Sequence, residues 1–189
     1  MFCSCNHIQE QRDFPLDDIL EGDLAFRCGQ GMFSRAVTIA EESGIYSHVG
    51  ILVQQQGNWR VVHSVPGERE GDEDFDRVKS EELEVFFSKK RAIKGCLVHT
   101  GLEDSTIIKV LCHNAIDALI DSVKFDNEYN TNDTSKVYCT EFIWRLYSGC
   151  GIDLSEGRRK YIKAFNIQGD VILPEHILNY SGNRIYYRF

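Results

Sequence analysis

Two neighbouring β-rich runs in the first half of the chain constrain the fold most strongly. The runs His48–Val53 and Trp59–His63 are dominated by Val, Ile and Leu, and residues 54–58 separate them with a polar, glycine-containing loop. This arrangement is typical of a β-hairpin with a five-residue connection. The sequence therefore predicts antiparallel strands at the centre of the fold.

A histidine lies near the outer end of each of these runs. If residues 53 and 59 flank the turn, His48 falls opposite Ser64 and close to His63. A histidine at the mouth of a strand can accept a proton from a nucleophile, and a second polar group can orient it. Either histidine alone is also compatible with a purely structural, hydrogen-bonded role. The presence of both histidines at the same end of the predicted hairpin favours a functional pair.

The helical signals lie mainly in the second half of the chain. Apolar residues recur every fourth position over 104–123, with Asp104 or Ser105 available as the N-terminal cap. A second helix is expected over 139–148, ended by Gly149. The remaining expected elements are strands over 22–27, 91–98 and 184–189, a helix over 34–42, a short helix opened by Pro174, and a solvated acidic excursion over 68–84. Because helices and strands segregate along the chain, the predicted class is α+β.

Cys139 is the candidate nucleophile. It directly follows a polar loop and begins the predicted helix over 139–148. Unpaired backbone N–H groups at a helix N-terminus stabilise a thiolate, which is the reactive form of cysteine. A small apolar side chain that fills the start of a helix face is the alternative interpretation. Paired with His48, this thiol is expected to have a lowered pKa and to react with alkylating agents below neutral pH.

Charge and cysteine content exclude several classes of protein. The chain has 21 basic and 29 acidic residues, a net charge of −8, and no basic run with interleaved aromatics, so nucleic acid is not an expected partner. Seven cysteines without regular spacing do not form a disulfide framework. No apolar stretch is long enough to span a bilayer. Cys96-x-x-His99 and Cys112-His113 resemble zinc-ligand spacing, but the side chains diverge on a strand or helix, so no metal or other cofactor is expected.

The N-terminal segment has a different character from the rest. Residues 2–6, Phe-Cys-Ser-Cys-Asn, are similar to the end of a bacterial lipoprotein signal, although the basic and apolar regions of such a signal are missing. Residues 1–21 are expected to be an extension, with a single domain over 22–189. The cell envelope and the cytoplasm are the two locations that this segment leaves open.

Several stretches in sequence order resemble a known family. They are GDLAFRCGQGMFSRAV, YSHVGILV, VVHSVPG, VYCTEFIWRLY and GDVILPEHI. Together these stretches, from about Gly22 to Ile177, resemble permuted papain-like amidases of the YaeF/YiiX type, relatives of NlpC-type peptidases and lecithin–retinol acyltransferases. The resemblance implies a circularly permuted papain-like fold, with a small antiparallel, barrel-like sheet and packed helices.

The resemblance also implies roles for individual residues. His48 matches the family's base, and Cys139 matches its nucleophile. The third polar residue is typically Glu in the family, whereas this chain has His63, and Thr140 replaces the serine that follows the nucleophile. In these families, the base precedes the nucleophile along the chain only in the permuted group.

These observations together predict a cysteine peptidase- or amidase-type hydrolase. Cys139 would attack an amide or ester of a small molecule, peptide or lipid, and His48, oriented by His63, would take the thiol proton. The backbone N–H of Cys139 would stabilise the oxyanion, and Tyr138 or Tyr46 would add a donor or a substrate wall. The alternatives are a non-catalytic envelope-associated binding module that keeps the cleft, and a thiol acyltransferase acting on lipids.

Overall fold

The predicted hairpin forms the centre of the sheet, but its turn is shorter than expected. In the computed structural model, which describes residues 12–29, 44–69, 71–164 and 167–189, β2 (His48–Gln55) pairs with β3 (Asn58–Val65). Gln56 and Gly57 form a two-residue turn with φ angles of 51° and 83°. Positive φ at both central positions is the type I′ geometry that matches strand twist. The predicted five-residue loop is therefore wrong.

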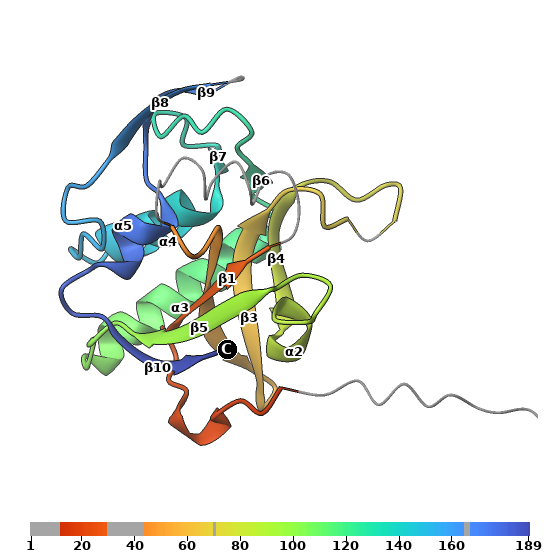
Figure 1. The fold of residues 1–189 in the computed structure, drawn as a ribbon, viewed down its shortest axis with the longest axis vertical. Helices are drawn as coiled ribbons and strands as arrows, with labels where there is room; N and C mark the ends of the chain where they lie inside the picture. Colours follow the sequence, from red (N-terminus) through yellow and green to blue (C-terminus); the bar gives the residue numbers. More distant parts are fainter. Residues whose placement is uncertain (1–11, 30–43, 70, 165–166) are drawn as a thin grey trace, which may run out of the picture.

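Eight strands form one curled sheet (Figure 1). Neighbouring strands are antiparallel except for the short parallel pair β6–β7. The order across the sheet is β10 (Arg184–Arg188), β5 (Lys94–His99), β1 (Leu24–Cys28), β2, β3, β4 (Arg77–Glu82), β6 (Lys124–Phe125) and β7 (Lys136–Val137). The sheet closes only part of the way into a barrel and gives the mixed α+β class that the sequence predicts.

The two long helices cover one face of the sheet. They are α3 (Ser105–Ile120) and α4 (Cys139–Ser148), both close to their predicted bounds. Asp104 caps α3 by accepting hydrogen bonds from the backbone N–H groups of Thr106 and Ile107. Apolar residues of both helices pack with one side of β2, and this is the larger of the apolar cores. Burial of this face holds α4 against the start of β2.

The opposite face of the sheet carries a second core. Its members include Leu52 of β2 and Phe86 of the short helix α2 (Leu83–Phe86). Phe14 and Ile19, within the predicted N-terminal extension, are buried in this core, next to the 3₁₀ helix η1 (Leu16–Asp18). These contacts join residues 12–21 to the sheet.

The remaining elements lie toward the C-terminus. The helix α5 (Pro174–Leu178) begins at Pro174, as predicted. The strands β8 (Lys160–Ala164) and β9 (Ile167–Val171) pair with each other as a separate hairpin that extends away from the main sheet (Figure 1). Among the described residues, no helix has the length and apolar character needed to cross a membrane.

Two sequence predictions need comment here. The acidic excursion over 68–84 is wrong in part, because Arg77–Glu82 forms β4 and pairs with β3 over six positions. The helix expected over 34–42 and the lipoprotein-like residues 2–6 lie outside the described residues.

Candidate active site

His48 and His63 lie in direct contact, as the sequence predicts. Nε2 of His48 is 2.8 Å from Nδ1 of His63, and the rings meet edge to face. The ladder register of Ile51 opposite Val62 places Gly50 opposite His63, so His48 is a diagonal neighbour on the same face. The predicted register, with residue 48 opposite 64, is wrong by one residue and would have put the two rings on opposite faces. The shorter turn is the reason for this difference.

Gly50 makes room for this pair. A Cβ added at Gly50 would lie 2.4 Å from Cγ1 of Val61 and 3.0 Å from Cβ of His63. Both distances are at or below the closest approach that side chains tolerate, so the absence of a side chain at Gly50 leaves the space that Val61 and His63 occupy. Phe86 of α2 packs against both imidazole rings and closes the other side.

Both imidazoles are held in the neutral form. His63 is fully buried and His48 nearly so. Burial lowers the pKa of His48 well below its usual value, and the positive charge of Arg27 and the proximity of His63 lower it further. Burial also lowers the pKa of His63, although the carboxylate of Glu81 partly offsets this effect. A neutral imidazole carries one proton and one free nitrogen lone pair, and can therefore act as a base.

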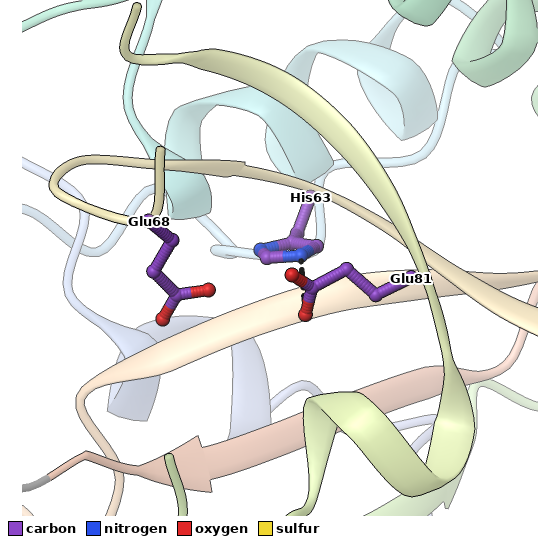
Figure 2. Close-up of side chains that lie close together, drawn as sticks. All are labelled: His63, Glu68 and Glu81. Carbon is purple, nitrogen blue, oxygen red and sulfur yellow. Dashed lines mark ion pairs between the residues drawn. The ribbon is translucent and has the colours of Figure 1, made fainter. Parts of the chain in front are cut away.

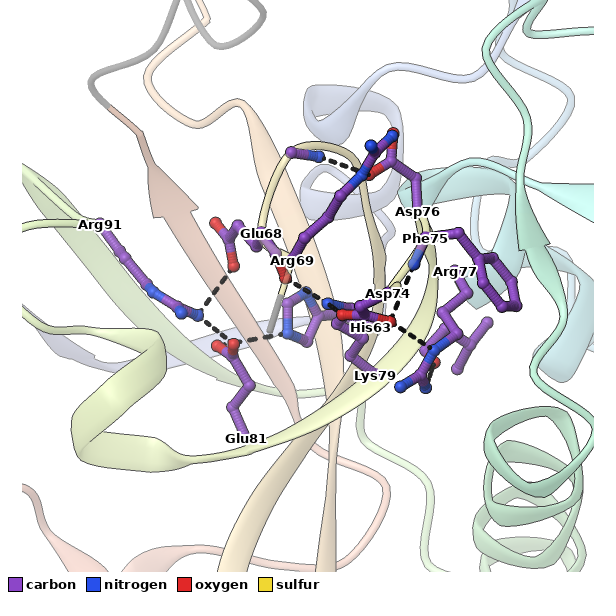
Figure 3. A network of polar contacts seen from close by, with 12 residues as sticks. His63, Glu68, Arg69, Asp74, Phe75, Asp76, Arg77, Lys79, Glu81 and Arg91 are labelled. Atoms are coloured by element: carbon purple, nitrogen blue, oxygen red, sulfur yellow. Dashed lines mark hydrogen bonds and ion pairs between the residues drawn. The ribbon is translucent and has the colours of Figure 1, made fainter. Parts of the chain in front are cut away.

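A partly buried network of charged residues lies on the far side of His63 (Figure 3). Nε2 of His63 faces Oε2 of Glu81 at 3.4 Å. The guanidinium of Arg91 contacts Glu81 and also lies 2.8 Å from Glu68, which in turn pairs with Arg27 at 2.5 Å. Burial would raise the pKa of Glu81, but the contacts with His63 and Arg91 outweigh it and lower the pKa to about 2. Glu81 is therefore an ionised acceptor behind His63.

Cys139 lies at the first position of α4, as predicted, and its sulfur faces the backbone at the start of β2. Val49 packs in the same core as Cys139, whereas the neighbouring His48 points to the opposite face of β2, against Phe86. Among the described residues, no hydrogen bond joins the thiol to His48, so the structure brings His48 to His63 and does not bring it to Cys139.

The backbone N–H groups of Thr140, Val49 and Cys139 itself stabilise the thiolate, and Val49 directly follows His48. Burial nevertheless raises the pKa of Cys139 to about 11, because desolvation outweighs these hydrogen bonds and the charge of Arg27. The expected lowering of the pKa is therefore wrong for this state, in which Cys139 is a neutral thiol.

The first turn of α4 is fixed by contacts to the end of the chain. The hydroxyl of Tyr138 accepts a hydrogen bond from the N–H of Ile172 at 2.9 Å, and the hydroxyl of Thr140 donates to the carbonyl of Ile172 at 2.6 Å. The N–H of Tyr138 donates to the buried carboxylate of Glu141 at 3.3 Å. These contacts set the position of the thiol relative to β2.

The two tyrosines proposed as substrate contacts are both buried. Tyr138 is 1% exposed and its hydroxyl is occupied by Ile172. Tyr46 is buried in the larger core, where its hydroxyl interacts with the thiol of Cys96. In this state, their burial favours a structural role for both side chains over a wall of the substrate site.

The zinc-like spacings of the sequence do not come together. Asp23 binds His99, and His113 lies at the surface of α3 beside Asp117. Within the described part of the chain, the only Cys, His, Asp and Glu side chains grouped closely enough to hold a metal ion are those of His63, Glu68 and Glu81 (Figure 2).

Comparison with solved structures identifies the architecture. The chain is similar to the crystal structure of the metalloprotein yiiX from Escherichia coli O157:H7 (DUF1105), with a TM-score of 0.72. The chain has the yiiX fold. The likeness covers 89% of this chain and 97% of yiiX, at 18% sequence identity. No family model and no curated protein matches the sequence.

Sequence reasoning missed the charged half of the site. Glu68 and Glu81 fall within the predicted solvated excursion over 68–84, and Arg27 and Arg91 fall within predicted strands. The available signal was alternation in β4, where Lys79 and Glu81 fall on one face. Because that face is polar although buried, hydrophobic periodicity gives no indication of this strand.

Proposed function

We propose that this protein is a cysteine hydrolase that cleaves an amide or ester through an acyl-thioester on Cys139. The observation that carries the proposal is the buried chain of Glu81, His63 and His48, which ends at the first residue of β2, next to Val49, whose backbone N–H contacts the Cys139 sulfur. The proposal requires the side chain of His48 to turn around this end of β2 to reach the thiol. A base, a group that orients it and an ionised acceptor in line are the parts that nucleophilic catalysis by a thiol requires.

The order of these groups gives a direction to the protons. The carboxylate of Glu81 has no proton to donate, so Nε2–H of His63 points toward it and Nδ1 of His63 carries the lone pair. Nδ1 of His63 then accepts the Nε2–H of His48 at 2.8 Å. This leaves Nδ1 of His48 as the basic nitrogen. The tautomer of the base is therefore set by a residue that does not touch it.

The proposed reaction uses that nitrogen twice. The Cys139 sulfur forms a bond to the carbonyl carbon while the thiol proton passes to Nδ1 of His48. The carbon–nitrogen or carbon–oxygen bond of the substrate then breaks, and His48 returns the proton to the leaving amine or alcohol. Water attacks the thioester, the free acid leaves, and the proton from water restores the thiol through His48.

The raised pKa of Cys139 determines at which step of the proposed reaction the thiol loses its proton. Since Cys139 is a neutral thiol in the resting site, deprotonation by His48 accompanies attack on the substrate and does not precede it. The N–H of Cys139 at the start of α4 supplies a donor for the developing oxyanion. A permuted papain-like relationship fits this arrangement, because the base on β2 precedes the nucleophile on α4 and the helix packs on the sheet. Small-molecule, peptide and lipid acyl groups are the candidate substrates.

Acyl trapping tests the proposal directly. The full chain is incubated with a panel of p-nitrophenyl esters and peptide amides, quenched in acid, and digested for mass spectrometry. We expect an acyl adduct on Cys139 that disappears in the Cys139→Ala variant and becomes at least about 100-fold slower to form in His48→Gln. Cys112, another buried thiol but in the middle of α3, is the internal control and should carry no adduct. Equal acylation of both thiols would contradict the proposal.

A non-catalytic binding module is the second candidate. The burial of Cys139 and the pKa of about 11 favour it, because most buried cysteines are inert. It predicts that a substrate-like ester binds without acylation and that Cys139→Ala binds as well as the wild type. Detection of the adduct described above would eliminate this candidate.

A further inference from the structure

His63 and Glu81 leave a gap between them that a hydrogen bond does not fill. Nε2 of His63 and Oε2 of Glu81 are 3.4 Å apart, and neither buried atom has a hydrogen-bond partner. A good N–H···O hydrogen bond spans about 2.7–3.2 Å. Because buried polar atoms are normally paired, two unpaired atoms that face each other indicate a missing group.

Glu68 supplies a third donor at the same place. One oxygen or nitrogen atom from each of His63, Glu68 and Glu81 lies within 4.8 Å of the others (Figure 2). A tetrahedral zinc ion with bonds of about 2.0–2.2 Å holds its ligand atoms about 3.4 Å apart. The His63–Glu81 separation already equals that value, and Glu68, in the loop after β3, is partly exposed and gives access from solvent. We infer that His63, Glu68 and Glu81 form a binding site for a divalent transition-metal ion of the zinc type.

Two arginines set the conditions under which the ion can bind. Arg27 and Arg91 neutralise the two carboxylates, so the ion must replace one guanidinium. The side chain of Arg27 is 3% exposed and is held by the carbonyl of Phe86, whereas that of Arg91 is 28% exposed and can turn toward solvent. The metal ion and Arg91 therefore compete for the same carboxylate oxygens.

The ion would reverse the proton order described above. Coordination through Nε2 places the single proton of His63 on Nδ1, which then donates to Nε2 of His48. His48 keeps its own proton on Nδ1 and has no lone pair for the thiol of Cys139. This consequence rests on the proposed function: metal binding turns off the base by changing its tautomer, without contact with the nucleophile.

Direct binding of Zn²⁺ to the full chain is the first test. The Cys139→Ser background removes the nearby thiol as a competing ligand, and affinity is measured by competition with a chromogenic chelator. Glu81→Gln is expected to weaken binding at least about tenfold, whereas Glu82→Gln, its exposed neighbour on β4, should not. Equal affinity in Glu81→Gln and Glu82→Gln would overturn the inference.

Two further measurements keep the test independent of how any one variant folds. Arg91→Gln should bind Zn²⁺ more tightly than the parent, because it removes the competing cation while keeping all three ligands. In the unsubstituted chain, Co²⁺ should give the visible absorption of a tetrahedral site, and Zn²⁺ should abolish it. No gain in Arg91→Gln, or a cobalt spectrum lost in His99→Gln but kept in Glu68→Gln, would assign the metal elsewhere.

These readouts separate the metal site from the hydrolase. Zn²⁺ affinity does not depend on turnover, and acylation of Cys139 is measured in chelated protein. Failure of acylation leaves the metal site standing, and failure of Zn²⁺ binding leaves the hydrolase standing. If both proposals hold, Zn²⁺ should slow the acylation of Cys139 in the wild type. In Glu68→Gln, which binds Zn²⁺ more weakly, a correspondingly higher Zn²⁺ concentration should be needed for the same slowing.

Discussion

Two carboxylate–histidine pairs of the sheet differ in how completely they are satisfied: Asp23, just before β1, pairs with His99 at the end of β5, and Glu81 on β4 faces His63 on β3. Asp23 accepts from Nδ1 of His99 at 2.9 Å and from the hydroxyl of Tyr186 at 3.1 Å, and the two rings stack at 3.9 Å. His63 and Glu81 are 3.4 Å apart with an unpaired atom on each. A closed pair stabilises the fold, whereas an open pair is able to bind or to move a proton.

The presence of a cavity does not identify which of the two carboxylate–histidine pairs is functional. Asp23 and His99 line a cavity of about 370 Å³, but none of the residues around that cavity is a cysteine. Near the other pair, the Cys139 thiol at the N-terminus of α4 contacts the backbone N–H of Val49, the residue after His48. The two pairs therefore differ in their surroundings: a cavity lies beside the closed pair, and a thiol at a helix N-terminus lies near the strand that carries His48.

The largest expected effect is on acylation. His48→Gln should reduce the rate of Cys139 acylation at least about 100-fold, because a general base contributes about 10²–10⁴-fold. His99→Gln, at the closed pair, should change the rate less than about twofold. The two variants are compared by mass spectrometry under identical conditions. A similar loss in both would remove the functional distinction between the two pairs.

The next effect concerns the room beside His63. Gly50→Ala should lower the free energy of unfolding by about 1–3 kcal/mol, since its Cβ overlaps Val61 and presses on His63. Acylation should fall with it as His63 is pushed away from His48. Gly169→Ala, in β9 with open space around it, is the matched control. Urea denaturation of both variants gives the comparison, and an unperturbed Gly50→Ala would contradict the packing described here.

A smaller effect is expected at the closed pair. Asp23→Asn keeps one acceptor but weakens the contacts with His99 and Tyr186, so it should cost about 1 kcal/mol of unfolding free energy. Acylation of Cys139 should stay at the wild-type rate. The exposed Asp121→Asn serves as control for the change of net charge. Loss of acylation without loss of stability in Asp23→Asn would show that this pair takes part in the chemistry.

The smallest effect is on simple alkylation. With a pKa of about 11, only about one Cys139 in ten thousand is a thiolate at pH 7, so the iodoacetamide rate should rise with pH up to about 11. His48→Gln should leave this profile in place, because a neutral imidazole does not stabilise the thiolate as an ion pair. Labelling is followed from pH 6 to pH 11 by mass spectrometry. Rapid labelling of the wild type below pH 7 would mean that a thiolate–imidazolium pair forms after all.

The sequence was sufficient for the elements with strong periodicity. The helices α3 and α4 follow from apolar spacing and capping residues. The hairpin predicts that His48 and His63 lie close together, but not that their rings lie on one face. The turn was misjudged because type I′ turns usually carry Asn-Gly or Asp-Gly, whereas this one is Gln56-Gly57. The resulting one-residue difference in register decides whether the rings of His48 and His63 lie on the same face of the hairpin.

The proximity of the charged residues of the site could not be predicted from the local pattern of residue types along the sequence. Glu68, Glu81 and Arg91 approach one another only because β4 folds back on β3 and the segment after α2 returns across it. Their side chains are polar, so burial of that face leaves no hydrophobic signature. The donors of the inferred metal site have no spacing motif for the same reason.

The hydrogen bonds that join Tyr138 and Thr140 to the backbone of Ile172 have a consequence for biosynthesis. Thr140 and its partner Ile172 are 32 residues apart in the chain, so the ribosome makes the cysteine well before the residue that anchors its helix. A nascent polypeptide that ends before Ile172 contains Glu81, His63 and His48. It lacks the backbone groups that hold Tyr138 and Thr140, on either side of Cys139. The first turn of α4 can thus take its final position only after Ile172 has been synthesised.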